Sequence, residues 1–267
     1  MNKTQFPTSF MGVDSEEAYE RIMNEKESAQ APITTQTSFN LPNPNIPKSD
    51  YIQIPKTEKV ISKFELQEYD NLTWKDTHFK LHENGLYMPV IPLFMTHFMN
   101  VLNSYKSKGK MPLFDASGNP ISKKEIEDIY LHLTKDHIAI YGNQAGAWTW
   151  LDAFFKDENG TMKILSEHKT IVNNGNKTLE AQKTENLENC LTEDCFSDLK
   201  FNSQGLPISK SSSQKYRQGN NLYSWFPRID RVAGFVANSG RAFLNCYRIP
   251  SCQNPILGVF GVAQSGL

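Results

Sequence analysis

The sequence predicts an α+β protein in which helices precede a β-rich C-terminal half. Two segments between residues 92 and 133 carry apolar side chains at helical spacing, and short apolar runs separated by turn-forming residues dominate from residue 148 onward. With 267 residues, 39% of them hydrophobic, the chain can bury a sizeable core. Helices that precede a run of strands would pack on the sheet, which is the α+β arrangement.

The first 55 residues are predicted to form a peripheral helix followed by an extended arm or linker. Asp14 with Glu17 three residues later forms a capping box, and the apolar residues that follow give a short amphipathic helix. Prolines then recur from Pro32 to Pro55, which forbids regular helix and favours extended chain. We therefore expect residues 1–55 to lie outside the main domain, which spans residues 56–267.

Strands near residues 60–66 and 77–81 are predicted next, because both segments show short apolar alternation. Two helices follow them. The first comes after Pro92, where apolar residues recur at helical spacing up to Leu102. The second is marked by Ser122 as its N-cap and by an acidic residue three positions later.

From Trp148 onward the pattern is typical of strands. Aromatic residues there precede a turn at residues 157–160, and a further apolar alternation follows. Residues 202–221 are polar and are predicted to form a loop. Four short apolar runs come after it, at residues 222–227, 232–237, 242–244 and 257–263.

Composition and charge exclude several classes of function. Lys and Arg total 28 against 29 for Asp and Glu, and no basic block occurs, so we expect no binding to nucleic acid. No apolar run reaches the roughly 18 residues of a spanning helix, and no signal peptide is evident, so we expect a soluble protein without membrane insertion. The protein could be displayed on a virion or on a cell surface. Four cysteines permit three disulfide pairings, and free thiols are an equal alternative.

No motif for catalysis or cofactor binding stands out. His78 and His82 are four residues apart, which suits zinc ligands on a helix, but residues 77–81 alternate like a strand and lack the metalloprotease Glu. His132 and His137 give no better case. There is no phosphate-binding loop and no dinucleotide fingerprint, and the Ser, His and Asp residues are too scattered to nominate a triad. We therefore predict no catalytic residue, no metal and no cofactor.

The C-terminal stretch differs in composition from the rest of the chain. Residues 233–267 contain only two charged residues, Arg241 and Arg248, where about seven would be expected at the chain's 21% average. Buried strands explain its two apolar runs. They do not explain residues 245–255, which mix turn-forming residues with aromatic and small polar ones. That mixture is typical of a recognition loop.

A frame of residues in this region resembles a known family. It reads, with x for a residue outside the frame, Leu222-Tyr223-x-Trp225-x-Pro227-Arg228, Val232-Ala233-x-Phe235-x-Ala237-x-Ser239-x-Arg241-Ala242-x-Leu244-x-Cys246, and then Pro250 and Leu257-Gly258-Val259. The frame is similar to the C-terminal part of C-type lectin-like folds of the formylglycine-generating-enzyme subtype. Within that group it resembles the variable proteins of diversity-generating retroelements, especially those of archaea and archaeal viruses. The resemblance covers about the last 120 residues.

The resemblance implies a non-enzymatic, receptor-type protein with a hypervariable ligand-binding region at about residues 233–263. In that family an error-prone reverse transcriptase rewrites adenines, typically in codons of Asn type, which can become Phe, Tyr, Ile, Val, Ser, Cys, Pro, Gly or Arg but not Lys, Glu, Met or Trp. The variable, ligand-binding positions that it implies here are Val236, Asn238, Gly240, Phe243, Asn245, Tyr247, Arg248, Ile249, Ser251, Cys252, Asn254, Pro255 and Ile256. The partner would be an unidentified macromolecular ligand, with protein as the first choice. The buried frame beneath these positions would include Trp225, Phe235, Leu244, Leu257 and Val259.

The chain departs from the family pattern in places, and two alternative functions follow from other features. Gly234 and Phe260 stand where the frame usually has arginine. A structural virion component is one alternative, because the N-terminal extension could serve assembly. The other is an oxidase of the formylglycine-generating type that uses Cys246 and Cys252, although its paired cysteines would fall near residues 231–237, where the chain has none. The calcium-binding loops of sugar-binding C-type lectins are absent.

Overall fold

The computed structural model describes residues 9–10, 13–14, 39, 41, 46–135, 146–238 and 240–264. The chain divides into two compact units, residues 1–36 and residues 37–267. In the first unit β1 (Ser9–Phe10) and β2 (Val13–Asp14) form an antiparallel pair, so Asp14 lies in a strand. The helix predicted after Asp14 lies outside the described residues. All the elements below belong to the second unit.

The second unit begins before the boundary predicted at residue 55. Strand β3 (Tyr51–Gln53) pairs with β4 (Lys59–Ser62), and β4 pairs with β12 (Val262–Gln264) near the other end of the chain. Tyr51 is fully buried. Pro55 therefore lies in the connection between two paired strands, so the predicted arm does not extend to residue 55. The strand predicted at residues 60–66 is β4 and ends at residue 62.

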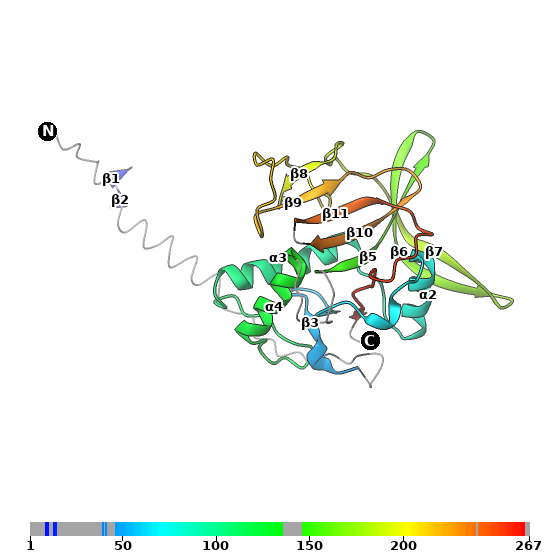
Figure 1. Ribbon diagram of the computed structural model, residues 1–267, viewed down its shortest axis with the longest axis horizontal. Coiled ribbons are helices and arrows are strands. Elements are labelled where there is room, and N and C mark those ends of the chain that lie inside the picture. Colours follow the sequence, from blue (N-terminus) through cyan, green and yellow to red (C-terminus); the bar gives the residue numbers. More distant parts are fainter. Residues whose placement is uncertain are drawn as a thin grey trace. The chain divides into compact units, whose positions relative to one another are not determined.

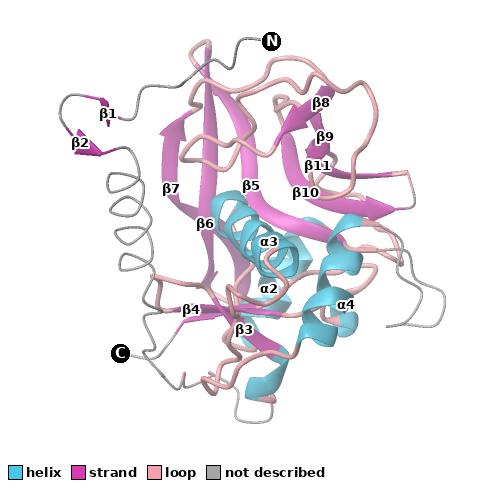
Figure 2. Ribbon diagram, turned by 90° about the vertical axis from the view of Figure 1, so that its left-hand side faces the viewer, coloured by secondary structure: helices cyan, strands magenta, loops and turns pink. Residues whose placement is uncertain are grey.

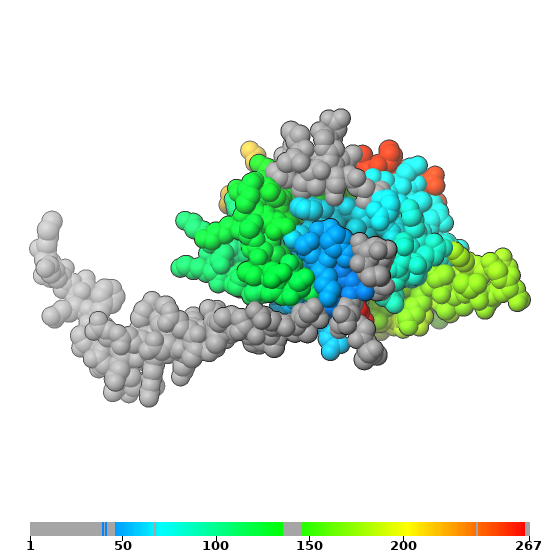
Figure 3. Space-filling view, turned by 90° about the horizontal axis from the view of Figure 1, so that it is seen from below, coloured from blue at the N-terminus to red at the C-terminus, as the bar shows by residue number. Residues whose placement is uncertain are grey.

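Seven strands form the main sheet, in the order β7-β6-β5-β10-β11-β9-β8. All neighbours are antiparallel except β11 and β9, which are parallel. Figure 1 shows β5, β10 and β11 side by side, and in Figure 3 the hairpin of β6 and β7 projects beside the segment that carries α2. The strand bounds are β5 Trp148–Glu158, β6 Thr161–Asn173, β7 Asn176–Asn186, β8 Cys195–Asp198, β9 Asn221–Trp225, β10 Arg231–Asn238 and β11 Arg241–Arg248.

Three α-helices occur among the described residues, so the mixed α+β class is confirmed. They are α2 (Trp74–Glu83), α3 (Ile91–Lys106) and α4 (Lys123–Thr134), with short 3-10 turns at Lys48–Asp50 and Gln67–Tyr69. The two helices predicted between residues 92 and 133 are present as α3 and α4, and the Ser122 hydroxyl accepts a hydrogen bond from the backbone N–H of Glu125, as expected for the N-cap. None of these helices is long and apolar enough to cross a membrane.

Helix α2 replaces the strand predicted at residues 77–81, and that prediction was wrong. The Thr73 hydroxyl caps the helix by accepting a hydrogen bond from the Asp76 N–H, 3.1 Å away. The buried side chains recur at the i, i+3, i+4 and i+7 spacing of one helix face, and they are Trp74, Thr77, His78 and Leu81. The apolar alternation was misleading because Phe79, its middle member, is only half-buried and lies off this face.

Each face of the sheet carries its own hydrophobic core. On one face α3 and α4 lie side by side over the central strands (Figure 2), and Phe94 of α3 packs against Phe235 of β10 with ring centroids 4.9 Å apart. On the other face Trp74 of α2, Trp150 of β5 and Leu257 of the C-terminal segment form the second core. Because neighbouring residues of a strand point to opposite faces, β5 serves both cores at once.

Candidate functional site

The predicted binding region lies on β10 and β11 and on the segment that follows β11. Leu244 of β11 points into the core under α3 and α4, so its neighbours in sequence, Phe243 and Asn245, point to the opposite face. Parallel pairing with β9 sets Phe243 beside Tyr223 and Asn245 beside Trp225. Side chains from two strands that are distant in sequence therefore share one patch of the sheet.

Arginine side chains lie over the aromatic rings of this patch. The guanidinium of Arg241 is 4.7 Å from the ring centroid of Tyr223, and that of Arg228 is 4.2 Å from the ring centroid of Tyr247. Such contacts are worth about 0.5–1 kcal/mol each when exposed and more when water is excluded. We call this surface the aromatic–arginine face and define it as Tyr223, Trp225, Arg228, Arg231, Arg241, Phe243, Tyr247 and Arg248.

A cavity of about 360 Å³ opens on the aromatic–arginine face. Tyr247 and Ile249 at its edge are 42% and 54% exposed, which is high for large apolar side chains. Apolar side chains grouped around a hollow mark interaction sites more often than apolar side chains scattered singly. The cavity is lined by Asp194, Trp225, Arg228, Asn245, Tyr247, Arg248, Ile249 and Cys252.

The charge at this cavity is positive. Arg228 pairs with Asp194, with 3.0 Å between Nη2 and Oδ2. Within the described parts of the chain, no acidic side chain forms an ion pair with Arg231 or Arg248. Burial lowers the pKa of Arg248, whose guanidinium lies 5.6 Å from the ring centroid of Trp148. The net charge of −1 for the whole chain conceals this local excess of cations.

Gly234 makes room for the side chain of Arg248. A Cβ atom at position 234 would lie 2.8 Å from Cδ of Arg248, which is too close for two carbon atoms. Gly234 is one of the two positions at which the family frame usually has arginine. Here the guanidinium next to this position comes instead from Arg248 of the neighbouring strand.

A ligand-binding surface should have most of the predicted variable positions exposed, but five of the 13 are exposed, five are half-buried and three are buried, so that expectation was wrong. Val236 lies in the middle of β10 between β5 and β11, Phe243 is covered by Trp225 at 4.8 Å between ring centroids, and Asn245 accepts a hydrogen bond from the Tyr247 N–H. The exposed positions are Gly240, Tyr247, Ile249, Ser251 and Pro255. The half-buried positions are Asn238, Arg248, Cys252, Asn254 and Ile256.

Four of the five residues expected in the buried frame are buried, and they are Phe235, Leu244, Leu257 and Val259. Trp225 is the exception. It is half-buried and lines the cavity, because its pairing with Asn245 puts it on the open face of the sheet. The prediction that Trp225 is a core residue was therefore wrong.

The four cysteines are free thiols. Cys246 is buried in the core under α3 and α4, whereas Cys252 packs against the core on the other face of the sheet. Burial raises the pKa of the Cys246 thiol well above its ordinary value. These two cysteines therefore do not form the adjacent, reactive pair that the oxidase alternative needs.

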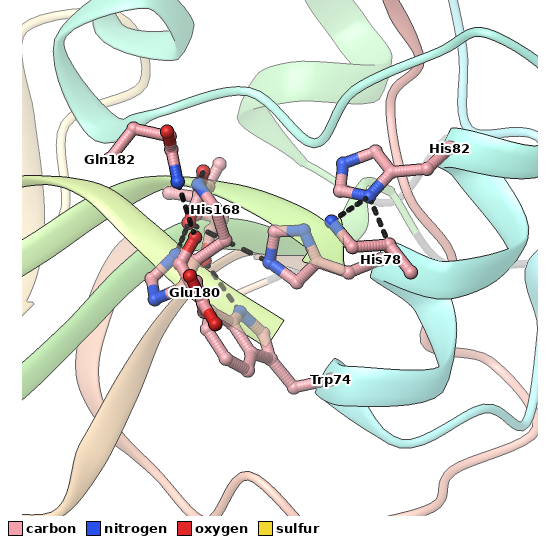
Figure 4. A network of polar contacts seen from close by, with 9 residues as sticks. Trp74, His78, His82, His168, Glu180 and Gln182 are labelled. Atoms are coloured by element: carbon pink, nitrogen blue, oxygen red, sulfur yellow. Dashed lines mark hydrogen bonds and ion pairs between the residues drawn. The ribbon is translucent and has the colours of Figure 1, made fainter. Parts of the chain in front are cut away.

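A second group of polar side chains lies between α2 and the sheet, and the sequence analysis missed it. His78 of α2, Asp152 of β5 and His168 of β6 each offer one ligand atom, and these atoms all lie within 4.8 Å of one another. Figure 4 shows His78 and Trp74 projecting from α2 toward His168 on the strand. Nδ1 of His168 is 2.5 Å from Oδ1 of Asp152, and Nε2 of His78 is 3.6 Å from the same oxygen. We call these three residues the histidine–aspartate cluster.

Irregularities in two strands position the histidine–aspartate cluster. The register between β5 and β10 shifts where Phe154 pairs with Val232 and Leu151 pairs with Ala233, so Asp152 lies in a bulge. In β6 the residue before His168 is Glu167, which has a φ of 56°. A non-glycine residue in this left-handed region costs about 1 kcal/mol or more, and such strain is concentrated at functional sites.

Burial controls the protonation of the cluster. It lowers the pKa of His78 to about 3, although the charge of Asp152 opposes this shift. Burial alone would raise the pKa of Asp152, but hydrogen bonds from the side chain and the backbone N–H of His168 outweigh it and hold that pKa below its ordinary value. His78 is therefore a neutral imidazole beside an ionised carboxylate near pH 7.

One signal for this cluster was present in the sequence. The spacing of His78 and His82 was noted, and the prediction of no metal site depended on a strand at residues 77–81, which the helix replaces. His82 itself does not join the cluster, because its Nδ1 accepts a hydrogen bond from the backbone N–H of Thr170.

Comparison of the chain with family models, with curated proteins and with solved structures finds no match in any of the three.

Proposed function

We propose that this chain is a receptor-type, non-enzymatic binding protein that recognises a macromolecular ligand, preferably a protein, through the aromatic–arginine face. One observation carries the proposal. Positions that the sequence analysis assigned to a variable surface line a single cavity, and they are Asn245, Tyr247, Arg248, Ile249 and Cys252. Composition and the family frame alone predict these positions, and neither depends on which side chains meet in space.

The residue types at this cavity suit a protein ligand. Trp, Tyr and Arg dominate the binding energy of protein interfaces, because each buries a large area or makes several hydrogen bonds. Here Trp225, Tyr247 and Arg228 supply all three types around one hollow. A cavity of about 360 Å³ can take an anchoring side chain of the ligand, while the exposed Ile249 and Tyr247 contact the surface around that anchor.

The cations of the face favour a partner with acidic groups at its contact surface. Arg228 already has Asp194, whereas Arg248 has no acidic partner among the described residues and keeps an Nε atom without a hydrogen bond. A carboxylate from the ligand would pair with the guanidinium of Arg248 where it lines the cavity, in a charge-assisted hydrogen bond. The opposite charges would also accelerate association at low salt.

We propose in addition that the sheet belongs to a C-type lectin-like scaffold that tolerates variation at its surface. The strand that carries Tyr247 is fixed from behind by Leu244 in the helix-covered core. Exposed side chains can therefore change while the buried ones hold the strand in place. Diversification by a retroelement would act on these exposed positions.

The genomic neighbourhood of the gene tests the retroelement part of the proposal. We expect a reverse transcriptase gene nearby and a template repeat that matches the codons of residues 233–263 except at adenines. Mismatches confined to the codons of the variable positions would support it. A neighbourhood without either feature would contradict it.

A comparison of two surface variants tests the binding part. The face variant carries Arg228→Ala and Tyr247→Ala, and the control variant carries Val172→Ala and Ile208→Ala, which remove apolar side chains that are 60% and 49% exposed outside the cavity. Cross-linking to surface proteins of the source organism, followed by mass spectrometry, should recover the same proteins with the wild type and the control and lose them with the face variant. Recovery of the same proteins with the face variant would refute the assignment of this surface.

A further inference from the structure

We propose that the histidine–aspartate cluster binds one divalent transition-metal ion, with zinc as the ion it suits best. The ligands would be His78, Asp152 and His168. This site is separate from the aromatic–arginine face, and the proposal does not depend on the proposed function.

The donor set is the first argument. Two imidazole nitrogens and one carboxylate oxygen are ligands that zinc and its neighbours in the first transition row prefer, and three protein ligands are the usual number at a zinc site with an open position. Zinc binds such atoms at about 2.0–2.2 Å, so two ligands of one tetrahedral ion lie roughly 3.4 Å apart. The 3.6 Å between Nε2 of His78 and Oδ1 of Asp152 is close to that separation and too long for a hydrogen bond.

The second argument is that His78 has unsatisfied nitrogen atoms. Its side chain is fully buried, and neither Nδ1 nor Nε2 has a hydrogen-bond partner. A buried polar atom without a partner costs about 1–3 kcal/mol, so native proteins avoid it unless a water molecule or an ion is involved. An ion held by His78 and Asp152 would coordinate Nε2 and remove that cost.

The remaining ligands are already oriented. The backbone N–H of His168 donates a hydrogen bond of 3.0 Å to Oδ2 of Asp152, which fixes the carboxylate and leaves Oδ1 facing both histidines. Nδ1 of His168 lies 2.5 Å from Oδ1 of Asp152, so the two atoms are hydrogen-bonded. Binding of the ion would replace this hydrogen bond: a hydrogen on Nδ1 would leave that atom, and the nitrogen and the oxygen would bind the ion.

Strain and access complete the argument. Asp152 lies in a bulge and His168 follows the left-handed Glu167, so two strands leave regular geometry at the residues that form the cluster. A cavity of about 250 Å³ is lined by Asp152, Glu167 and His168. It reaches two of the three ligands, and a water molecule there would take the fourth position.

Titration of the full chain with zinc tests the proposal. The protein is first treated with a chelator and exchanged into metal-free buffer, and ZnCl₂ is then added in a calorimeter. We expect one zinc ion per chain, and CoCl₂ should give the visible absorption of a low-symmetry cobalt site at the same stoichiometry. MgCl₂ should not compete, because magnesium prefers oxygen ligands.

The variants distinguish this site from adventitious binding. His78→Ala should weaken zinc binding by at least about 100-fold, since even the loss of a residue that only supports a ligand costs 10–100-fold. His97→Leu is the matched control, because His97 is also fully buried with both nitrogens unpartnered but has no carboxylate beside it. The control should bind zinc as the wild type does. Equal zinc binding by His78→Ala, or no zinc and cobalt binding by the wild type, would overturn the proposal.

A second variant keeps the test decisive if His78→Ala does not fold. Asp152→Asn preserves the shape of the side chain and removes its charge. Zinc should raise the midpoint of thermal unfolding of the wild type and of His97→Leu but not that of Asp152→Asn. An equal shift for Asp152→Asn would place the ion elsewhere and refute the assignment.

Discussion

Acid should destabilise this protein partly through His97, and the effect can be separated from that of other groups. His97 of α3 is fully buried against Phe94 and Phe260, with neither ring nitrogen hydrogen-bonded. Burial lowers its pKa to about 3, from an ordinary value of 6.5. Between these two values the unfolded chain binds a proton that the folded chain does not. His97 therefore causes no acid-dependent loss of stability above pH 6.5, and the free energy of unfolding decreases as the pH falls from 6.5 toward 3.

The size of the effect follows from the shift. Each pH unit below 6.5 costs about 1.4 kcal/mol, so at pH 5 the wild type should have lost about 2 kcal/mol through His97 alone. In His97→Leu this loss disappears, and at pH 7 the variant should be at least as stable as the wild type, because a polar ring without partners is replaced by an apolar side chain of similar size. His78 contributes an acid-dependent loss in the same direction, but it is present in both proteins and cancels in the difference.

Urea unfolding followed by tryptophan fluorescence at pH 7.5, 6 and 5 measures the difference. The gap in unfolding free energy between His97→Leu and the wild type should widen by about 2 kcal/mol from pH 7.5 to pH 5. Met95→Leu, a buried change on the same helix without a titratable group, should keep the pH dependence of the wild type. Parallel curves for His97→Leu and the wild type would refute the reasoning, since His97 would then bind its proton equally in both states.

Three further predictions concern the stability of the sheet and of helix α4. Leu257→Ala should cost about 2–5 kcal/mol because Leu257 is fully buried. Tyr247→Ala at an exposed position should lose mainly the contact with Arg228, about 0.5–1 kcal/mol, and equal losses for the two variants in urea unfolding would contradict the burial of the frame. Gly234→Ala should cost about 1–3 kcal/mol by pushing on Arg248, and the double variant with Arg248→Ala should recover most of that loss, which a double-mutant cycle measures. Ser122→Ala removes the cap of α4 and should lower stability by about 1 kcal/mol in the same assay, and an unchanged midpoint would show that the cap is dispensable.

The elements that the sequence predicted correctly are those with local signals. Helix α4 begins where Ser122 and Glu125 form a capping box, and α3 has a proline in its first turn. Such signals lie within a few residues of one another and do not depend on the rest of the fold. Helix α2 was mistaken for a strand because residues 77–81 alternate over five positions, which is too short to distinguish a period of two from a period of 3.6.

The long hairpin of β6 and β7 was not predicted in full because its outer half lies off the core. Side chains from residues 173 to 178 are exposed on both faces, so no apolar alternation marks them as strands. The sequence does contain Asn174-Gly175 at the turn, where both residues have positive φ. This dipeptide is a strong short-range signal of a hairpin and could have identified the pair of strands.

The two sites differ in how far the sequence could reveal them. Half of the residues of the aromatic–arginine face lie in the charge-poor stretch of residues 233–267, so composition indicated that part of it, although composition did not separate the buried Phe243 from the exposed Tyr247. The histidine–aspartate cluster joins His78, Asp152 and His168, which are far apart in sequence and meet only when α2 packs on the sheet. No local pattern encodes that meeting, and the bulge that turns Asp152 toward α2 has no signature in the sequence either.

The burial pattern restricts which predicted positions can vary freely on this scaffold. Val236 is fully buried in a central strand, so a change there to Asn, Ser or Arg would bury a polar group without a partner. The cost would be about 1–3 kcal/mol for the neutral Asn or Ser and more for the charged Arg. Tyr247 and Ile249 are open to solvent and can be replaced at little cost. Free variation and ligand contact are therefore compatible at the edge of the cavity, whereas at Val236 and Phe243 the need to keep the sheet packed limits the side chains that the fold accepts.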